Sequence, residues 1–318
     1  MSIRHTLACQ VCRKGMRHYV TGETPDYPAL REREARRSRP AVAPGSVTIT
    51  ETMLNGVPAE FLTCEENPTD RIILYFHGGS FVVGSPQTRR SFTGYLAAHA
   101  GYNVAAADYR LAPEHPFPAA PEDAFAAYRA LLQDYAPENI LLLGESAGGN
   151  LVLSVLLQIK AAQLSMPAAG ICLSPCVQYD EVLPSYTENL ETEYIVSDLT
   201  EEVYGSYLQS RDKEMVRHPL AAPYYGDFAG CAPIHLWAST AEILRDDSLI
   251  MFDKLKKAGH NCRLYLRDDM IHTWPIMPYY PEAIQDLQVL KTCMDDAFAG
   301  TLTREEEPIR LDNEPVQA

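Results

Sequence analysis

Hydrophobic and polar positions follow two periods along most of the chain. Short unbroken apolar runs, which are typical of strands buried on both faces of a parallel sheet, alternate with longer stretches whose apolar residues recur at helical spacing. The strands predicted from these runs cover 71–76, 102–107, 140–143, 168–173, 234–239 and 262–267. The predicted helices cover 91–100, 121–134, 147–164, 248–258 and 281–298. This alternation predicts an α/β fold built on a mostly parallel, doubly wound sheet.

The segment before the first buried run has a different pattern. Residues 47–53 alternate as in a half-buried strand and lead into Asn55 and Gly56, the strongest two-residue hairpin signal, and 58–64 supplies the returning strand. We therefore expect an antiparallel hairpin to open the sheet. At the other end, 301–318 is polar and acidic with two prolines, which predicts a flexible tail.

Size and composition favour one catalytic domain. The chain has 318 residues, of which 46% are hydrophobic, enough to bury a large core. It has no stretch of eighteen apolar residues, and its first residues include Arg4, His5, Arg13 and Lys14 without a long apolar run. The sequence therefore predicts neither a membrane span nor a secretory signal, and we expect a cytoplasmic protein.

Charge is distributed unevenly along the chain. Residues 1–40 hold nine Lys and Arg against four Asp and Glu, a net charge of +5. Because the whole chain has a net charge of −15, the remaining residues carry −20. An acidic body argues against nucleic acid or an anionic membrane surface as a partner. The basic run 31–39, interleaved with two glutamates, is expected to be the solvated face of a helix that ends at Pro40.

The eight cysteines are scattered, several of them inside apolar runs. Cys9 and Cys12 have CxxC spacing, but no second pair and no neighbouring strand accompany them. We interpret the cysteines as unpaired thiols that pack as small hydrophobes rather than as a metal or redox site.

The five residues Gly144–Glu145–Ser146–Ala147–Gly148 lie where a predicted buried strand runs into an apolar helix. This GxSxG spacing is that of a nucleophile elbow, in which a sharp, strained turn exposes the serine hydroxyl at the helix N-terminus. A serine that merely caps the helix would give the same five residues. The neighbouring motifs favour the nucleophile.

A second glycine-rich motif, His77 to Phe81, follows the predicted strand 71–76. Acyl transfer to a serine creates an oxyanion that needs two or three N–H donors aimed at one point, and glycines let the main chain approach the substrate closely. We expect these donors to be Ala147, directly after the nucleophile, together with Gly78, Gly79 and Ser80 of this loop.

Three motifs together, HGGSF at 77–81, DYRLAPE at 108–114 and GESAGGN at 144–150, resemble those of the hormone-sensitive-lipase-like esterases. The resemblance extends from about residue 47 to 298 and implies an α/β-hydrolase fold with a two-part helical cap over the site. Two positions depart from the usual forms HGGGF and GDSAGGN. Ser80 keeps the backbone N–H of the glycine it replaces but adds a side chain that narrows the acyl site.

A serine nucleophile needs a histidine to accept its proton and a carboxylate to orient that histidine. His272 follows the predicted strand 262–267, and its segment resembles the one that carries the histidine of the family. The other histidines after the elbow, at 218, 235 and 260, are better interpreted as core or surface residues. Residues 240–247 resemble the family's DPLRDE segment, with Glu242 in place of the aspartate. Asp246 is the alternative acid, although a first-turn acid next to a helix dipole explains it too, and Asp269 is too near His272 in sequence.

The resemblance divides the chain into four parts. Residues 1–45 are the N-terminal part of the cap, 46–176 and 226–300 the catalytic domain, 177–225 the inserted part of the cap, and 301–318 the tail. The inserted part carries four tyrosines that are candidates to line the pocket: Tyr186, Tyr194, Tyr204 and Tyr207. We predict substrate contacts for Phe81, Tyr194 and Trp274.

These motifs predict a carboxylic ester hydrolase that works through an acyl-enzyme intermediate of Ser146, with His272 as the base and Glu242 as the acid. The expected substrate is a small ester with a short acyl chain, because no broad apolar stretch is evident that would dock the protein on lipid. The reaction needs no metal or organic cofactor. The same residues could cleave an amide, a carbamate or a lactone, and members of the fold that lose a catalytic residue bind ligands instead. The resemblance also allows a homodimer paired through an edge strand.

Overall fold

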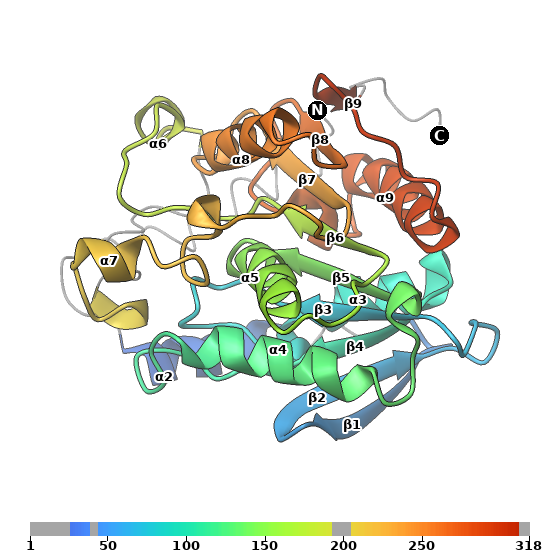
Figure 1. Cartoon of the computed structure of the whole chain (residues 1–318). Coiled ribbons are helices and arrows are strands. Elements are labelled where there is room, and N and C mark those ends of the chain that lie inside the picture. Colours follow the sequence, from blue (N-terminus) through green and yellow to red (C-terminus); the bar gives the residue numbers. More distant parts are fainter. Residues whose placement is uncertain (1–25, 39–43, 193–204, 312–318) are drawn as a thin grey trace.

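The computed structural model describes residues 26–38, 44–192 and 205–311. Within these ranges the chain forms one sheet of nine strands in the order β1-β2-β4-β3-β5-β6-β7-β8-β9 (Figure 1). The strands are β1 (Thr48–Leu54), β2 (Val57–Thr63), β3 (Ile72–Phe76), β4 (Asn103–Ala107), β5 (Ile140–Glu145), β6 (Ala169–Leu173), β7 (Ile234–Ser239), β8 (Cys262–Arg267) and β9 (Ile309–Leu311).

The sheet opens with the predicted hairpin and is parallel beyond it. β1 pairs antiparallel with β2 through Asn55 and Gly56, which both adopt positive φ as a tight hairpin turn requires. β2 pairs antiparallel with β4, and every later pairing is parallel. The prediction of an α/β fold with a mostly parallel sheet and an N-terminal antiparallel hairpin is confirmed.

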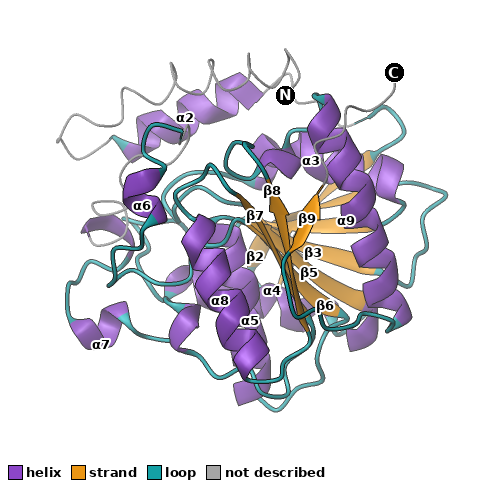
Figure 2. Cartoon of the chain, turned by 90° about the horizontal axis from the view of Figure 1, so that it is seen from above, coloured by secondary structure: helices purple, strands orange, loops and turns teal. Residues whose placement is uncertain are grey.

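Helices cover both faces of the sheet, as Figure 2 shows in the view along its edge. α4, α5 and α8 lie on one face, and α3 and α9 lie on the other. The helices are α2 (Tyr27–Ser38), α3 (Arg90–Tyr95), α4 (Ala119–Leu131), α5 (Ala147–Ala161), α6 (Ser185–Glu188), α7 (Lys213–Val216), α8 (Arg245–Lys257) and α9 (Pro281–Ala299). None of the helices in the described ranges combines the length and the apolar character that crossing a bilayer requires.

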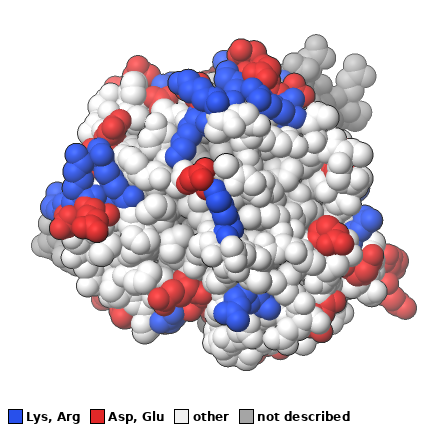
Figure 3. Space-filling model, in the orientation of Figure 1, with Lys and Arg blue, Asp and Glu red and all other residues white. Residues whose placement is uncertain are grey.

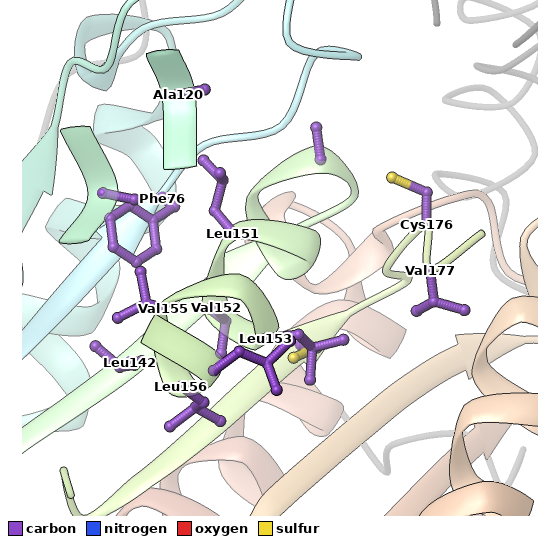
Figure 4. Packing of buried hydrophobic residues seen from close by; sticks show 14 of the residues in the cluster. Phe76, Ala120, Leu142, Leu151, Val152, Leu153, Val155, Leu156, Cys176 and Val177 are labelled. Atoms are coloured by element: carbon purple, nitrogen blue, oxygen red, sulfur yellow. The ribbon is translucent and has the colours of Figure 1, made fainter. Parts of the chain in front are cut away.

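Successive strand residues face opposite sides of the sheet and feed two separate cores. In β3, for example, Leu74 and Phe76 belong to the core under α4, α5 and α8, whereas Tyr75 belongs to the core under α3 and α9. Figure 4 shows how α5 packs Leu151 and Val155 against the strand residues of the first core. Because α5 is buried along nearly its whole length, the turn at its N-terminus is held rigidly.

The predicted flexible tail is wrong for its first part. Residues 301–311 are described, and Ile309–Leu311 forms β9, which pairs parallel with Tyr265–Arg267 of β8. Leu302 is buried in the core beside α9. The unpaired edge of β8 offers backbone hydrogen bonds that even a polar segment can accept, so pairing here does not need a local apolar pattern. Residues 312–318 lie outside the described residues.

The parallel strands all point their carboxyl ends at the same edge of the sheet, where ligands bind in open α/β folds. The elbow after β5, the glycine loop after β3, and the loops after β7 and β8 therefore share this edge. On the face drawn in Figure 3, acidic and basic side chains lie interspersed among neutral ones, so neither sign of charge dominates it.

Candidate active site

Ser146 occupies the strained turn between β5 and α5. Its backbone has φ 55° and ψ −119°, a conformation that L-residues rarely adopt and that is typical of a nucleophile elbow. The flanking glycines are required by space, because a Cβ on Gly144 would lie 2.3 Å from the oxygen of Gly148, and one on Gly148 would lie 2.0 Å from the oxygen of Phe76. The turn therefore forms only with glycine at both positions.

The glycine loop after β3 has three consecutive residues at positive φ: Gly79 at 125°, Ser80 at 52° and Phe81 at 63°. The amides of Val82 and Val83 both donate to the oxygen of Gly79, which closes the turn. A tight turn of this kind can direct successive N–H groups to one side of the chain, where they bind an anion. The loop thus has the backbone form that an oxyanion hole needs.

One of the four predicted oxyanion donors is occupied elsewhere. The N–H of Gly78 donates to Oε1 of Glu145 at 2.6 Å, so the role predicted for the Gly78 amide is not supported. Glu145 is 1% exposed and also accepts from the Tyr75 hydroxyl at 2.5 Å and from Nε of Arg89 at 2.8 Å. Gly79, Ser80 and Ala147 remain as candidate donors.

The predicted histidine and acid are in direct contact. Nδ1 of His272 lies 2.6 Å from Oε2 of Glu242, and the two residues are 3% and 1% exposed. The second oxygen of the Glu242 carboxylate accepts from the backbone N–H of Ser239 at 2.8 Å. A carboxylate fixed in this way holds the imidazole with its Nδ1 proton inward and its Nε2 toward the site, which is the arrangement of a general base.

The end of β6 brings the histidine loop and the elbow together. The N–H of Ser146 donates to the oxygen of Leu173 at 2.8 Å, and the N–H of Thr273 donates to Oγ of Ser174 at 3.3 Å. Adjacent residues of one strand end thus hold the main chain at the elbow and next to His272. This places the two predicted catalytic segments side by side at the carboxyl edge of the sheet.

The alternative acid, Asp246, is engaged with other groups. Its carboxylate accepts from Nε of Arg245 at 2.7 Å and from the N–H of Ser185 at 2.8 Å. Burial acts to raise the pKa of Asp246, but these hydrogen bonds and the Arg245 charge outweigh it and keep the pKa below its ordinary value. Asp246 thus links the start of α6 to the start of α8. The geometry therefore favours Glu242 as the partner of His272.

The other histidines after the elbow have the structural surroundings expected of them. His235 is fully buried in β7, and its burial together with the charge of Arg263 lowers its pKa to about 3. His260 is 8% exposed, with Nε2 3.0 Å from the oxygen of Ala232. His218 is exposed and packs edge-on against Phe117. None of the three forms the carboxylate pair that His272 forms.

Two of the three residues predicted to contact the substrate are buried against other residues. Trp274 is fully buried, and its Nε1–H donates to Asp286 at 2.8 Å. Phe81 is 1% exposed and stacks on Tyr207 with ring centroids 3.8 Å apart. Neither presents surface to a substrate, so their predicted contacts are not supported. Tyr194, like Tyr204, lies outside the described residues.

The sequence did not predict the contacts that Tyr109, His77 and Asn189 make at the site. The Tyr109 hydroxyl donates to the oxygen of His77 at 2.6 Å, and its ring stacks on the His77 ring, which fixes the start of the glycine loop. Burial lowers the pKa of His77 to about 3, so its ring is neutral at ordinary pH. Asn189 donates to the oxygens of Thr240 and Glu242, which ties the segment after α6 to the acid loop. The DYRLAPE motif signalled Tyr109; no local pattern signals Asn189.

No group of three or more His, Cys, Asp or Glu side chains in the described ranges is arranged to hold a metal ion. The six cysteines that the structure describes are unpaired, and Cys9 and Cys12 lie outside the described residues. Burial raises the pKa of Cys176, which keeps this thiol near the site protonated.

Known proteins resemble this chain in sequence and in fold. A family described as having the alpha/beta hydrolase fold matches residues 73–276. The chain is 37% identical to an acetyl-hydrolase of Streptomyces hygroscopicus over 222 residues, which are 68% of this chain and 73% of that protein. It is 31% identical to an esterase of Acinetobacter venetianus over 245 residues, covering 76% of this chain and 80% of that one.

Solved structures are similar over almost the whole chain. An esterase from the bacterial hormone-sensitive lipase family superposes with a TM-score of 0.86 at 31% identity, covering 94% of this chain and 99% of that one. The esterase EstE5, in a crystal soaked with p-nitrophenyl butyrate, superposes with a TM-score of 0.87 at 30% identity, covering 94% of this chain and all of that one.

Proposed function

Because the chain belongs to the α/β-hydrolase family, and within it to the hormone-sensitive-lipase-like esterases, we propose that it is a serine carboxylesterase that hydrolyses esters with short acyl chains. Ser146 is the nucleophile, His272 the general base and Glu242 the acid that orients it. The observation that carries the proposal is the buried 2.6 Å contact between Nδ1 of His272 and Glu242, anchored on the same strand end as the elbow.

The reaction proceeds in two halves. His272 Nε2 takes the proton of Ser146 Oγ as the oxygen attacks the ester carbonyl, and the carboxylate of Glu242 stabilises the imidazolium that forms. The N–H groups of Gly79, Ser80 and Ala147 stabilise the negative oxygen of the tetrahedral intermediate. His272 then protonates the departing alkoxide, which leaves an acyl group on Ser146. A water molecule activated by His272 repeats the attack and releases the acid.

The preference for short acyl chains has two supports. Ser80 adds a side chain to the glycine loop at a position where the resembled family usually has glycine, and we propose that it narrows the space beside the reacting carbonyl. The large apolar side chains exposed in the described ranges are few, namely Met53, Val182, Leu190, Tyr279 and Ile284, and a lipid interface needs a broader patch. An acetyl-hydrolase among the relatives and the p-nitrophenyl butyrate soaked into EstE5 agree with this preference.

The cap, the location and the assembly belong to the same proposal. We propose that the described residues 26–38, 44–45, 177–192 and 205–225 belong to a cap over the site; the rest of the predicted cap segments 1–45 and 177–225 lies outside the described residues. The protein acts in the cytoplasm, a placement that cell fractionation would test. A homodimer paired through the sheet would have to use β1 or β9, the outer strands of the sheet as described, and size-exclusion chromatography with light scattering would test it.

The test is covalent labelling followed by a substrate series. A serine-directed phosphonate should label the wild type on the peptide that carries Ser146, and Ser146→Ala should lose labelling and at least about 10⁴-fold of the kcat on p-nitrophenyl butyrate. Ser154→Ala, a buried serine of α5 two turns further on, is the matched control and should stay active. A panel of acetyl to decanoyl esters, with amide, carbamate and lactone substrates, then defines the class. Faster turnover of decanoyl than of butyryl esters contradicts the short-chain preference.

A further inference from the structure

Two carboxylates hold the glycine loop, one at each end. At the start of the loop, Glu145 Oε1 accepts the N–H of Gly78 at 2.6 Å. At its end, Glu34 Oε2 accepts the N–H of Gly84 at 3.0 Å. Glu145 belongs to the nucleophile elbow, whereas Glu34 belongs to α2, a helix far away in sequence that lies against the loop. The segment that carries the Gly79 and Ser80 donors is therefore held between the elbow and α2.

Arg89 joins the two carboxylates. Its Nε donates to Glu145 Oε1 at 2.8 Å and its Nη1 donates to Glu34 Oε1 at 3.0 Å. Nη1 also lies 2.9 Å from Oγ1 of Thr88. The Arg89 side chain is 16% exposed, against 1% for Glu145 and 27% for Glu34, so the ion pairs are shielded from water in part. Burial lowers the pKa of Arg89, but the charges of the two glutamates outweigh it and hold the pKa above its ordinary value.

α2 makes a second contact with the same loop. Arg31, three residues before Glu34 and so on the same face of the helix, donates through Nε to the oxygen of Val82 at 2.7 Å. Its Nη2 donates to the oxygen of Ala112 at 2.6 Å, and the guanidinium also pairs with Glu114. Arg31 is thus a loop contact, which corrects the expectation that the basic run 31–39 is only a solvated face.

We propose that Glu34, Arg89 and Arg31 are positioning residues for the oxyanion hole, so that α2 is part of the catalytic apparatus as well as of the cap. This inference rests on the proposed function. The N–H donors of the loop come from residues held at positive φ, and such a conformation persists only where its surroundings fix it. Glu34 and Glu145 fix the ends of the loop, and Arg89 makes their positions depend on each other.

The expected effect follows from the sensitivity of oxyanion stabilisation to geometry. Loss of one donor costs about 10² to 10³ in kcat, and a misplacement of about 1 Å can cost about 10²-fold. A loosened loop keeps its donors but aims them less well. It therefore affects the transition state, in which the oxygen is charged, more than the bound ester, and kcat falls while KM stays nearly constant.

The experiment compares this ion-pair network with its neighbour. Glu34→Gln removes the charge facing Arg89 and keeps a carbonyl acceptor for the Gly84 N–H, and Arg89→Lys keeps the charge but cannot reach both carboxylates with the same fork. The matched control is Glu60→Gln, which removes the charge facing Arg90 in a similarly buried pair whose hydrogen bonds join β2 to the start of α3 rather than to the glycine loop.

Four quantities are measured for each variant: kcat and KM on p-nitrophenyl butyrate, the inhibition constant of an alkyl trifluoromethyl ketone, and the melting temperature. The ketone forms a charged hemiketal oxygen with the serine and so reports on the oxyanion hole directly. We expect Glu34→Gln to lower kcat about 3- to 10-fold and Arg89→Lys about 10- to 50-fold, with KM within about twofold and ketone affinity falling in step with kcat/KM. Glu60→Gln should change none of the three constants by more than about twofold.

The outcomes distinguish a failure of the positioning role from a failure of the proposed function. Wild-type kcat and ketone affinity in folded Glu34→Gln and Arg89→Lys overturn the positioning role. A loss of melting temperature with unchanged ketone affinity also overturns it, because the residues are then structural only. Since Glu34 is partly exposed, its variant tests the inference even where Arg89→Lys does not fold. Continued hydrolysis by Ser146→Ala overturns the proposed function itself and leaves a different signature.

Discussion

The two sides of the elbow are held by different chemistry. On the β3 side, the glycine loop is fixed by full charges, since Arg89 pairs with both Glu145 and Glu34. On the β7 and β8 side, the groups that hold Glu242 and the residues before His272 are neutral. Ser239 Oγ donates to the oxygen of Met270 at 2.6 Å, and Asn189 Nδ2 donates to the oxygen of Glu242 at 2.8 Å. The ion pairs on this side act on other residues: Arg267 pairs with Asp286, which accepts the N–H of Trp274, and Arg245 pairs with Asp246.

This difference suits the role that the proposed mechanism gives to each side. The β3 side supplies backbone N–H groups, whose dipoles do not change during the reaction, so strong ion pairs can fix them without disturbing the chemistry. On the β7 side, the proposed mechanism requires Glu242 to stabilise a positive charge that appears on His272 only in the transition state. A cation bonded to Glu242 would compensate its charge in advance and weaken that effect, whereas the N–H of Ser239 orients the carboxylate and leaves its charge for the imidazole.

The largest expected effect comes from changing the acid itself. Glu242→Gln keeps the size of the side chain but replaces the carboxylate by an amide, which holds His272 in the wrong tautomer when its NH₂ faces Nδ1. We expect kcat on p-nitrophenyl butyrate to fall about 10⁴-fold, as for the corresponding change in other triads. Asp246→Asn should cost less than about threefold, because its carboxylate contacts Arg245 and Ser185 rather than the imidazole. A greater loss in Asp246→Asn than in Glu242→Gln contradicts the assignment.

The strands, and the loops that carry the site, could be predicted from the sequence because they depend on local patterns. The buried run before Ser146 and the glycines around it predict the strand, the turn and the helix with little help from the rest of the chain. Glu242 is predicted by its register with a segment of the resembled family, and it lies 2.6 Å from His272. The hairpin at Asn55 and Gly56 is likewise predicted by a local sequence pattern.

The errors concern residues whose surroundings come from distant parts of the chain. The Gly78 amide meets a carboxylate 67 residues away, and Trp274 packs in the core under α9, where Asp286 accepts its N–H. Glu34 lies in a charge run that looks solvated, and only the folded chain brings it to Arg89. Neither spacing nor periodicity records such contacts. Both sides of the site therefore contain contacts that local patterns do not predict, although the motifs that carry the site are clear on both.

A smaller effect tests the neutral side. Ser239→Ala removes a hydroxyl that donates to the oxygen of Met270 and accepts the N–H of Ala241 at 3.1 Å, so the histidine and acid loops lose a shared anchor. We expect kcat to fall about tenfold with little change in KM, since Glu242 keeps its bond from the Ser239 backbone. Ser248→Ala, a fully buried serine at the start of α8, is the control and should retain kcat within about twofold. Equal losses in the two variants would mean that packing, not the hydroxyl bonds, matters here.

The β7 and β8 side also contains a buried carboxylate, Asp247 of α8, whose hydrogen-bond donors are uncharged. Asp247 is fully buried and accepts from the N–H of Val177 at 2.9 Å and from the hydroxyl of Tyr186 at 2.6 Å, both uncharged donors. Burial raises its pKa to about 7, although these hydrogen bonds oppose the shift. Asp247 can be compared directly with Glu145, because both carboxylates are buried but only Glu145 has an opposite charge beside it, that of Arg89.

The raised pKa of Asp247 predicts a pH dependence of stability. Between about pH 4 and pH 7 the unfolded chain releases the Asp247 proton and the folded chain retains it, so this group makes the wild type lose stability as pH rises through that window. Asp247→Asn removes the titration and keeps an acceptor for Val177, while the Tyr186 hydroxyl can accept from the new amide. Its free energy of unfolding relative to the wild type should therefore improve by roughly 2 kcal/mol from pH 5 to pH 8 in denaturant titrations. Asp246→Asn is the control: the pKa of Asp246 is lowered, so its titration lies below this window and the difference from wild type should stay flat. A flat difference for Asp247→Asn as well would mean that this carboxylate is already charged at pH 5, and that neutral donors alone stabilise it as well as an arginine would.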